Sequence, residues 1–213
     1  MKTDELINVL GANVEPVNSG HLRNALLAAL AVGAAAAFCL RLAMYGVPAD
    51  PFNGKDIGLK VAGLAFALSL VVVGGRFLIK SARPGEAGRG PLIVIGLLLF
   101  AIFSAGAIAL ALASPAAWRG MVFGPQWAAC FFCIPLFAAL PFVSLVWALR
   151  RAAPTRLALT GAVIGLVAGA LGAAVCAYHY PSSSIPFLVL WYGGPVVLCA
   201  VIGAMLGPRL LRW

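Results

Sequence analysis

The chain has 213 residues, of which 63% are hydrophobic and only 10% are charged, and its formal net charge is +9. A soluble domain carries roughly a quarter charged residues, so this chain has too little polar surface to cover a globule in water. The composition excludes an ordinary soluble domain and predicts an integral membrane protein that has the lipid bilayer as a partner. Five cysteines spread through apolar runs do not resemble the disulfide framework of a secreted protein.

The N-terminal segment, residues 1–23, opens with MKTDELINVL. A threonine at its start can cap a short amphipathic helix, with two acidic residues near the positive end and three aliphatic residues on one face. About eight residues cannot hold a helix alone in water, so the segment either lies on the membrane or folds against a partner. Its acidic rim favours a groove on a basic protein over anionic lipid, and the remaining alternative is an inert terminus. The predicted partner-binding residues are Asp4, Glu5, Leu6, Ile7 and Leu10.

Six apolar stretches follow, each near the ~20 residues that cross a ~30 Å hydrocarbon core. Runs of this length without alternation predict helices rather than barrel strands. We expect an all-α, polytopic bundle of six transmembrane helices, with a short cytoplasmic tail at 208–213 after a transmembrane domain at 24–207. The predicted spans are 24–45, 57–79, 91–113, 127–149, 157–178 and 187–207.

The basic residues predict the topology. If the N-terminus, the second and fourth links and the C-terminus share one side, that side holds 11 of the 15 Lys and Arg residues. The positive-inside rule then places both termini in the cytoplasm. This distribution accounts for the net charge without any direct contact with nucleic acid. The residues on the cytoplasmic side are Lys2, Arg23, Arg76, Lys80, Arg83, Arg89, Arg150, Arg151, Arg156, Arg209 and Arg212, against Arg41, Lys55, Lys60 and Arg119 outside.

Three spans carry small or charged residues whose placement can be predicted. Arg41 and Lys60 lie near the outer interface, where we expect their charged ends to extend toward water. In the fifth span Gly161, Gly165 and Gly169 recur every four residues, which favours close helix packing within the bundle.

The cysteines are the chief candidates for chemistry. Cys130 and Cys133 begin the fourth span within QWAACFFCIP, and Cys176 ends the fifth span one turn before His179. A Cys-x-x-Cys pair in a helix puts both thiols on roughly one face. Metal ligation would need further donors, for which Cys176 and His179 are the candidates, so the presence of a metal is left open. For Cys39 and Cys199 we favour a packing role.

The order of several motifs resembles the NrsF-like membrane anti-sigma factors. The motifs are the opening MKTDELI, WxxC at Trp127–Cys130, the WALRRAAPTR end of the fourth span, the FLVLWYG start of the sixth, and the terminal LGPRLLRW. The resemblance covers essentially the full chain. It implies a bacterial inner-membrane protein, and not an enzyme, that holds an extracytoplasmic-function sigma factor inactive and releases it under metal or oxidant stress.

The resemblance also implies roles for individual residues. The cysteine of the WxxC motif is Cys130, and the family's acidic start matches the segment predicted to bind a partner. The family's second periplasmic cysteine corresponds to Tyr180 here, which leaves Cys133 and Cys176 as candidates to replace it. We therefore expect a sensing group formed by Cys130 with Cys133, Cys176 and His179, and no cofactor.

Two other classes compete with this interpretation. A membrane thiol–disulfide oxidoreductase also keeps Cys-x-x-Cys in a small helical bundle, but it usually needs a second cysteine pair to pass electrons on. A small metal transporter is less favoured, because no acidic residue falls in any predicted span. The sequence does not predict the oligomeric state.

Overall fold

A computed structural model describes residues 19–46, 57–81, 89–124, 127–150, 156–177 and 184–212. Within these ranges it contains six helices long and apolar enough to cross a membrane, as predicted, and their bounds differ from the predicted spans by a few residues. Residues 1–18 of the N-terminal segment and Trp213 of the tail lie outside the described residues, and the first helix begins at Ser19, within the segment predicted to precede it. The elements are α2 (Ser19–Tyr45), α3 (Ile57–Ser81), α4 (Gly90–Leu112), α5 (Pro115–Val122), α6 (Trp127–Arg150), α7 (Leu157–Ala177), α8 (Ile185–Leu188), the π-helical turn η1 (Val189–Gly193) and α9 (Gly194–Leu210).

The link between the third and fourth predicted spans contains a helix that was not predicted. Helix α5 begins with Pro115 after the extended residue Ser114. Proline suits the first turn of a helix, because its φ angle is already helical and its missing N–H would have no partner there. The indole nitrogen of Trp118 donates to the carbonyl oxygen of Ala113 at 3.2 Å, which ties the new helix to the end of α4.

The sixth span is continuous but irregular. It starts as α8, passes through η1, and continues as α9. Pro195 is the second residue of α9, one residue after η1 ends. A proline inside a helix has no N–H and crowds the carbonyl four residues earlier, which here belongs to Trp191 in η1. The π-helical turn accommodates this defect.

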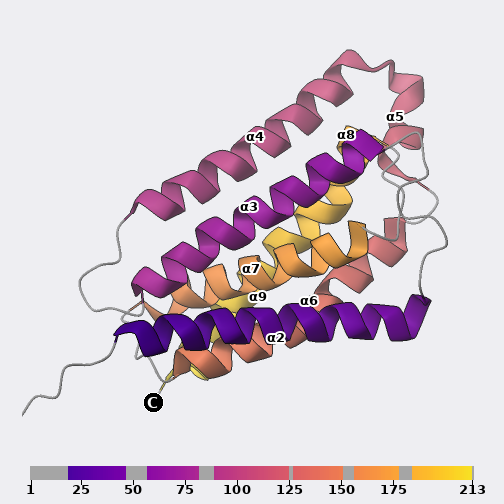
Figure 1. Cartoon of the computed structure of the whole chain (residues 1–213). Coiled ribbons are helices and arrows are strands. Elements are labelled where there is room, and N and C mark those ends of the chain that lie inside the picture. The colour runs from indigo at the N-terminus through magenta and orange to yellow at the C-terminus, as the bar shows by residue number, and fades with distance from the viewer. Residues whose placement is uncertain are drawn as a thin grey trace, which may run out of the picture.

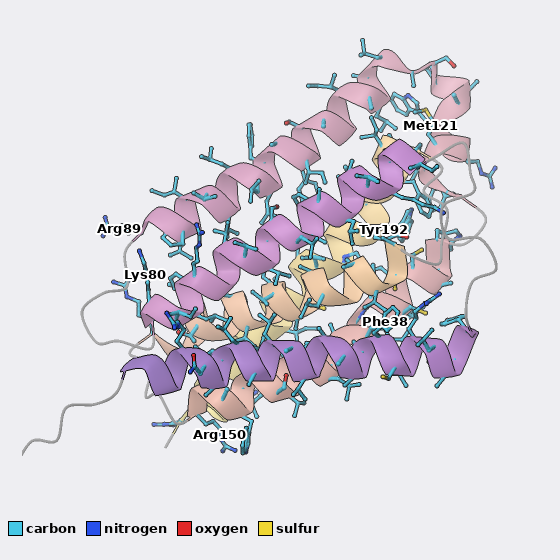
Figure 2. All side chains as sticks on the ribbon, viewed as in Figure 1. Phe38, Lys80, Arg89, Met121, Arg150 and Tyr192 are labelled. Atoms are coloured by element: carbon cyan, nitrogen blue, oxygen red, sulfur yellow. The ribbon has the colours of Figure 1, made fainter. Side chains whose placement is uncertain are left out.

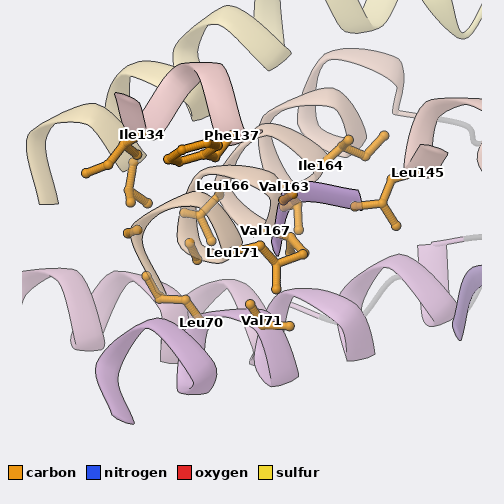
Figure 3. Packing of buried hydrophobic residues seen from close by; sticks show 14 of the residues in the cluster. Leu70, Val71, Ile134, Phe137, Leu145, Val163, Ile164, Leu166, Val167 and Leu171 are labelled. Carbon is orange, nitrogen blue, oxygen red and sulfur yellow. The ribbon is translucent and has the colours of Figure 1, made fainter. Parts of the chain in front are cut away.

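Helix α7 lies at the centre of the bundle, between α3, α6 and α9 (Figure 1). Most of its residues are buried. Figure 3 shows Val167 and Leu171 of α7 near Leu70 and Val71 of α3, with Phe137 of α6 in the same cluster. In contrast, α4 lies at the edge beyond α3, and Ile95 and Gly106 are its buried residues (Figure 1).

Small residues mark the face that α7 presents to α9. A Cβ added to Gly165 would collide with the carbonyl oxygen of Cys199, and one added to Gly161 would collide with that of Gly203. A Cβ on Gly169 would come within 3.0 Å of the Cys199 Cβ. In lipid, such close approach and the van der Waals contact it allows hold helices together. The prediction that the glycine stripe packs within the bundle is confirmed.

Helix α2 packs chiefly against α6. A Cβ added to Gly33 would lie 2.6 Å from both the Pro141 Cα and the Ser144 Oγ, so the two helices are close at this point. The Ser144 hydroxyl contacts the carbonyl oxygens of Ala29, on α2, and of Pro141, on its own helix, each at 2.9 Å. This polar contact fixes α2 on α6 in the half of the bundle where α2 begins.

Basic side chains gather at one end of the bundle, which we call the basic end. Helix α2 begins and α9 ends there, and Figure 2 shows Lys80, Arg89 and Arg150 at this end. The opposite end, where α2 finishes and α6 begins, is called the thiol end. Of the 11 basic residues in the described ranges, Arg41, Lys60 and Arg119 belong to the thiol end, and eight belong to the basic end: Arg23, Arg76, Lys80, Arg89, Arg150, Arg156, Arg209 and Arg212.

Candidate functional site

Three of the four predicted sensing residues meet at the thiol end. Cys130 and Cys133 lie one turn apart near the start of α6, and Cys176 lies in the last turn of α7. Their exposed fractions are 0%, 8% and 1%. Cys176 lies within the range of electrostatic interaction with both α6 thiols and belongs to the same set of buried side chains. The two helices therefore bring the three sulfur atoms into one buried cluster, which we call the thiol cluster.

The fourth predicted sensing residue, His179, lies outside the described residues. Within the described ranges, no group of three or more His, Cys, Asp or Glu side chains is arranged to hold a metal ion.

Two tyrosines extend the thiol cluster, and neither was predicted from the sequence. The Tyr45 hydroxyl, at the end of α2, lies 3.0 Å from the Cys133 Sγ, and either atom can donate the hydrogen bond. The Tyr45 ring also meets Phe137 edge-on, with 6.4 Å between centroids. The Tyr192 side chain, carried by η1, interacts with the Cys130 thiol. The cluster thus joins α2, α6, α7 and the irregular part of the sixth span.

Arg41 is part of this site, and the expectation that it extends toward water is wrong. Its side chain is 1% exposed, so it lies inside the protein. The guanidinium carbon is 5.9 Å from the Phe38 ring centroid, and the group interacts with Cys176. Arg41 lies one turn before Tyr45 in α2, so both side chains lie on the same face of the helix. Arg41 is the sole charged residue in the first apolar run. This feature of the sequence could have identified it as a site residue, because ionisable residues within membrane spans are commonly functional.

The other two cysteines lie away from the cluster. Cys199 is buried on α9 against the α7 glycines, in agreement with a packing role. It also lines an apolar groove of about 190 Å³ between α6, α7 and α9. Cys39 is exposed on α2, so the expectation that it is a buried packing residue is wrong.

Aromatic residues hold α5 against the thiol end. The Trp191 indole nitrogen donates to the Val122 carbonyl oxygen at 2.7 Å, and its ring lies 4.8 Å from that of Trp127. The Ser184 hydroxyl donates to the Met121 carbonyl oxygen at 2.6 Å. Trp127 is the tryptophan of the WxxC motif, so this aromatic packing fixes the turn of α6 that carries Cys130.

The predicted partner-binding residues Asp4, Glu5, Leu6, Ile7 and Leu10 all lie outside the described residues. The chain that carries them leads directly into α2, whose first turn is at the basic end (Figure 1). The thiol cluster and the start of α2 are therefore at opposite ends of the same bundle.

The family described as "Negative regulator of sigma F" (NrsF) matches residues 10–213. Along its whole length, the chain is 33% identical over 226 aligned residues to "Anti-sigma-F factor NrsF" of Caulobacter vibrioides, and it covers all of that relative. It is 29% identical over 213 residues to "Probable anti-sigma-F factor NrsF" of Azospira oryzae, again with both chains fully covered. No solved structure matches the chain.

Proposed function

Because the chain belongs to the NrsF family of negative regulators of sigma F, we propose that it is an anti-sigma factor of the bacterial inner membrane. It sequesters an extracytoplasmic-function sigma factor at its cytoplasmic face and releases that factor when oxidants or metals act on its thiols. The observation that carries this proposal is the separation of two features: a buried thiol cluster at one end, and the start of α2 at the other.

The charges support the orientation of the bundle in the membrane. Eight of the 11 described basic residues belong to the basic end. Cytoplasmic loops of membrane proteins carry an excess of Lys and Arg, so this end faces the cytoplasm, and α2 starts and α9 finishes there. The thiol cluster then lies near the periplasmic surface, where oxidants and metal ions arrive first.

The thiols can respond in two ways. When two of them form a disulfide, they lose two protons and two electrons; a hydroperoxide accepts these and leaves as an alcohol and water. Alternatively, a thiophilic metal ion displaces the protons of two of the thiols and binds their sulfur atoms, with His179 as a further candidate donor. Either change links α6 to α7 when Cys176 takes part. The change releases sigma only if the altered bundle binds sigma more weakly than the resting one.

Family membership favours this regulatory function over the thiol oxidoreductase and the metal transporter. A reduced protein substrate distinguishes the enzyme directly, because an oxidoreductase would introduce disulfides into it and an anti-sigma factor would not.

The sensor role is tested by Cys130→Ser in cells that carry a sigma-dependent reporter. We expect the variant to repress the reporter without stress, because serine occupies nearly the same volume as cysteine, and to lose induction by hydroperoxide or metal, because the reactive sulfur is gone. Cys39→Ser is the matched control, since Cys39 is exposed and lies outside the cluster. Normal induction in Cys130→Ser would show that Cys130 is not the sensor.

A further inference from the structure

Helix α2 is in direct contact with the thiol cluster at one end and leads into the N-terminal segment at the other. At the thiol end, Tyr45 contacts the Cys133 sulfur at 3.0 Å, and Arg41 interacts with Cys176. Its first turn lies at the basic end, where the chain has come from residues 1–18 (Figure 1). A displacement of α2 therefore reaches the proposed sigma-binding residues without passing through another helix.

The contacts between α2 and α6 include two polar ones that are far apart along the helix. One is the Tyr45–Cys133 contact at the thiol end, and the other is the Ser144–Ala29 hydrogen bond toward the basic end, at 2.9 Å. Between them Gly33 has no side chain to interlock with α6. At 1.5 Å per residue, Tyr45 is about 24 Å from Ala29 along the axis, and the first residue of α2 is about 15 Å beyond Ala29 on the other side. Rotation about the Ser144 contact would thus carry more than half of any displacement at Tyr45 to the basic end.

We propose that Tyr45 is the residue through which α2 responds to the thiols, and that α2 is the moving element of the switch. This inference rests on the proposed function. While Cys133 is a free thiol, the Tyr45 contact keeps α2 against α6 in the position that retains sigma. When Cys133 is oxidised or captured by a metal, the contact is lost, and α2 tilts about the Ser144 hydrogen bond.

The separation of 3.0 Å explains why Tyr45 would detect a change at Cys133. It leaves no space for an atom bonded to the sulfur between the two side chains. Where the thiol is the donor, a disulfide or a metal bond also removes the proton that it donates; where the Tyr45 hydroxyl is the donor, the bond to the new partner draws the sulfur away from it. Because the Tyr45–Cys133 contact is partly buried, its loss raises the free energy of the resting position, and this penalty favours movement of α2. Arg41, buried one turn earlier and near Cys176, moves with Tyr45 and so would carry any change at Cys176 to the same helix.

Tyr45→Phe tests the proposed role of the Tyr45 hydroxyl without replacing any thiol. The substitution keeps the ring that packs on Phe137 but removes the hydroxyl. A hydrogen bond of ordinary strength corresponds to a change of about twofold to tenfold in an equilibrium constant. We expect sigma-dependent expression without stress to rise by that factor and the induction ratio to fall correspondingly, while oxidant modifies the thiols at the same dose as in the wild type. Ser69→Ala is the control, because it removes a hydroxyl that bonds to Phe66 within α3.

The movement itself can be measured on the full chain in lipid nanodiscs. Spin labels are attached through genetically encoded ketone residues to two pairs of exposed positions, one at each end of α2 and α4. The pairs are Met44 with Ile108 at the thiol end and Arg23 with Ile93 at the basic end. We expect hydroperoxide to shift both distance distributions in the wild type, and Tyr45→Phe to contain the shifted population before any oxidant is added.

Unchanged distances in Tyr45→Phe, or in wild-type protein whose thiols are shown by maleimide counting to be modified, would overturn the coupling. Failure of sigma to co-purify with the wild type would instead contradict the proposed function, whatever the distances show. The Tyr45→Phe measurement needs no inducing chemical, so it decides the inference even if hydroperoxide is not the natural signal.

Discussion

Gly165→Ala is expected to lower the free energy of unfolding by about 2–3 kcal/mol, within the range seen when atoms are forced into a packed core. The new Cβ would collide with the carbonyl oxygen of Cys199 on α9 and would lie 2.8 Å from its carbonyl carbon and 3.1 Å from the Ala200 Cα. These are backbone atoms, so no side-chain rotation relieves the contact, and α7 and α9 have to separate. Because α7 also packs on α3 and α6, the damage reaches the whole bundle.

The same substitution at Gly96 of α4 is the matched control. No atom lies within 4 Å of a Cβ added there, and the residue is exposed. Alanine favours the helix over glycine by up to about 1 kcal/mol, so Gly96→Ala should be neutral or stabilising. The same substitution is therefore expected to lower the free energy of unfolding at Gly165 and to leave it unchanged or raise it at Gly96. The space beside each glycine decides which effect occurs.

A thiol-reactive dye measures this difference in thermal unfolding. Four of the five cysteines are buried, so they react when the bundle opens, and a Cys39→Ser background removes the signal of the exposed one. We expect a lower midpoint for Gly165→Ala and an unchanged or higher one for Gly96→Ala. Equal midpoints would show that the α7–α9 contact is not as close as described.

Much of the bundle is predictable because its signals are local in sequence. An apolar run of sufficient length has to be a helix in lipid, since each backbone group needs a partner within the segment. The four-residue spacing of Gly161, Gly165 and Gly169 likewise identifies a packing face before any neighbour is known. Helix α5 was missed because eight residues with several polar neighbours carry too little periodicity, although Pro115 marked its start.

The composition of the candidate site was only partly predictable. Cys130 and Cys133 are one turn apart, so helix geometry alone puts them together, and Cys176 was expected at the same depth. Tyr45 and Tyr192 come from helices far away in the chain, and nothing local shows that they meet the thiols. Arg41 was assigned to the interface because its depth allowed it to reach water, whereas the packing of α2 on α6 turns the side chain inward.

This arrangement assigns different tasks to the two ends of α2. The thiol cluster is buried, so its modification changes packing between helices rather than the outer surface. The proposed sigma-binding residues precede α2 in the chain, so the response has to reach them along that helix. Residues that transmit the signal should then alter repression and induction together, whereas residues that bind sigma should alter repression alone.

The binding residues are tested by replacing both Leu6 and Leu10 with alanine. We expect sigma to be released and its genes to be expressed constitutively. Each buried leucine that is truncated to alanine costs about 2–5 kcal/mol, so one such loss alone lowers the affinity at least about 30-fold, and the two together should lower it further. Co-purification of sigma with the full chain from solubilised membranes measures the loss, and reporter expression without stress measures its consequence.

Asn8→Ala is the control for this experiment, because Asn8 would lie on the opposite face of a helix that presents Leu6, Ile7 and Leu10 together. It should leave repression unchanged, and all variants should reach the membrane in equal amounts, since the substitutions precede the first span. If sigma co-purified with the double variant as it does with the wild type, the N-terminal segment would not be the binding element. The basic end of the bundle would then have to bind sigma through its links. If instead only the leucine variant loses sigma while its thiols still respond to oxidant, binding and sensing are separate functions of one chain, joined by α2.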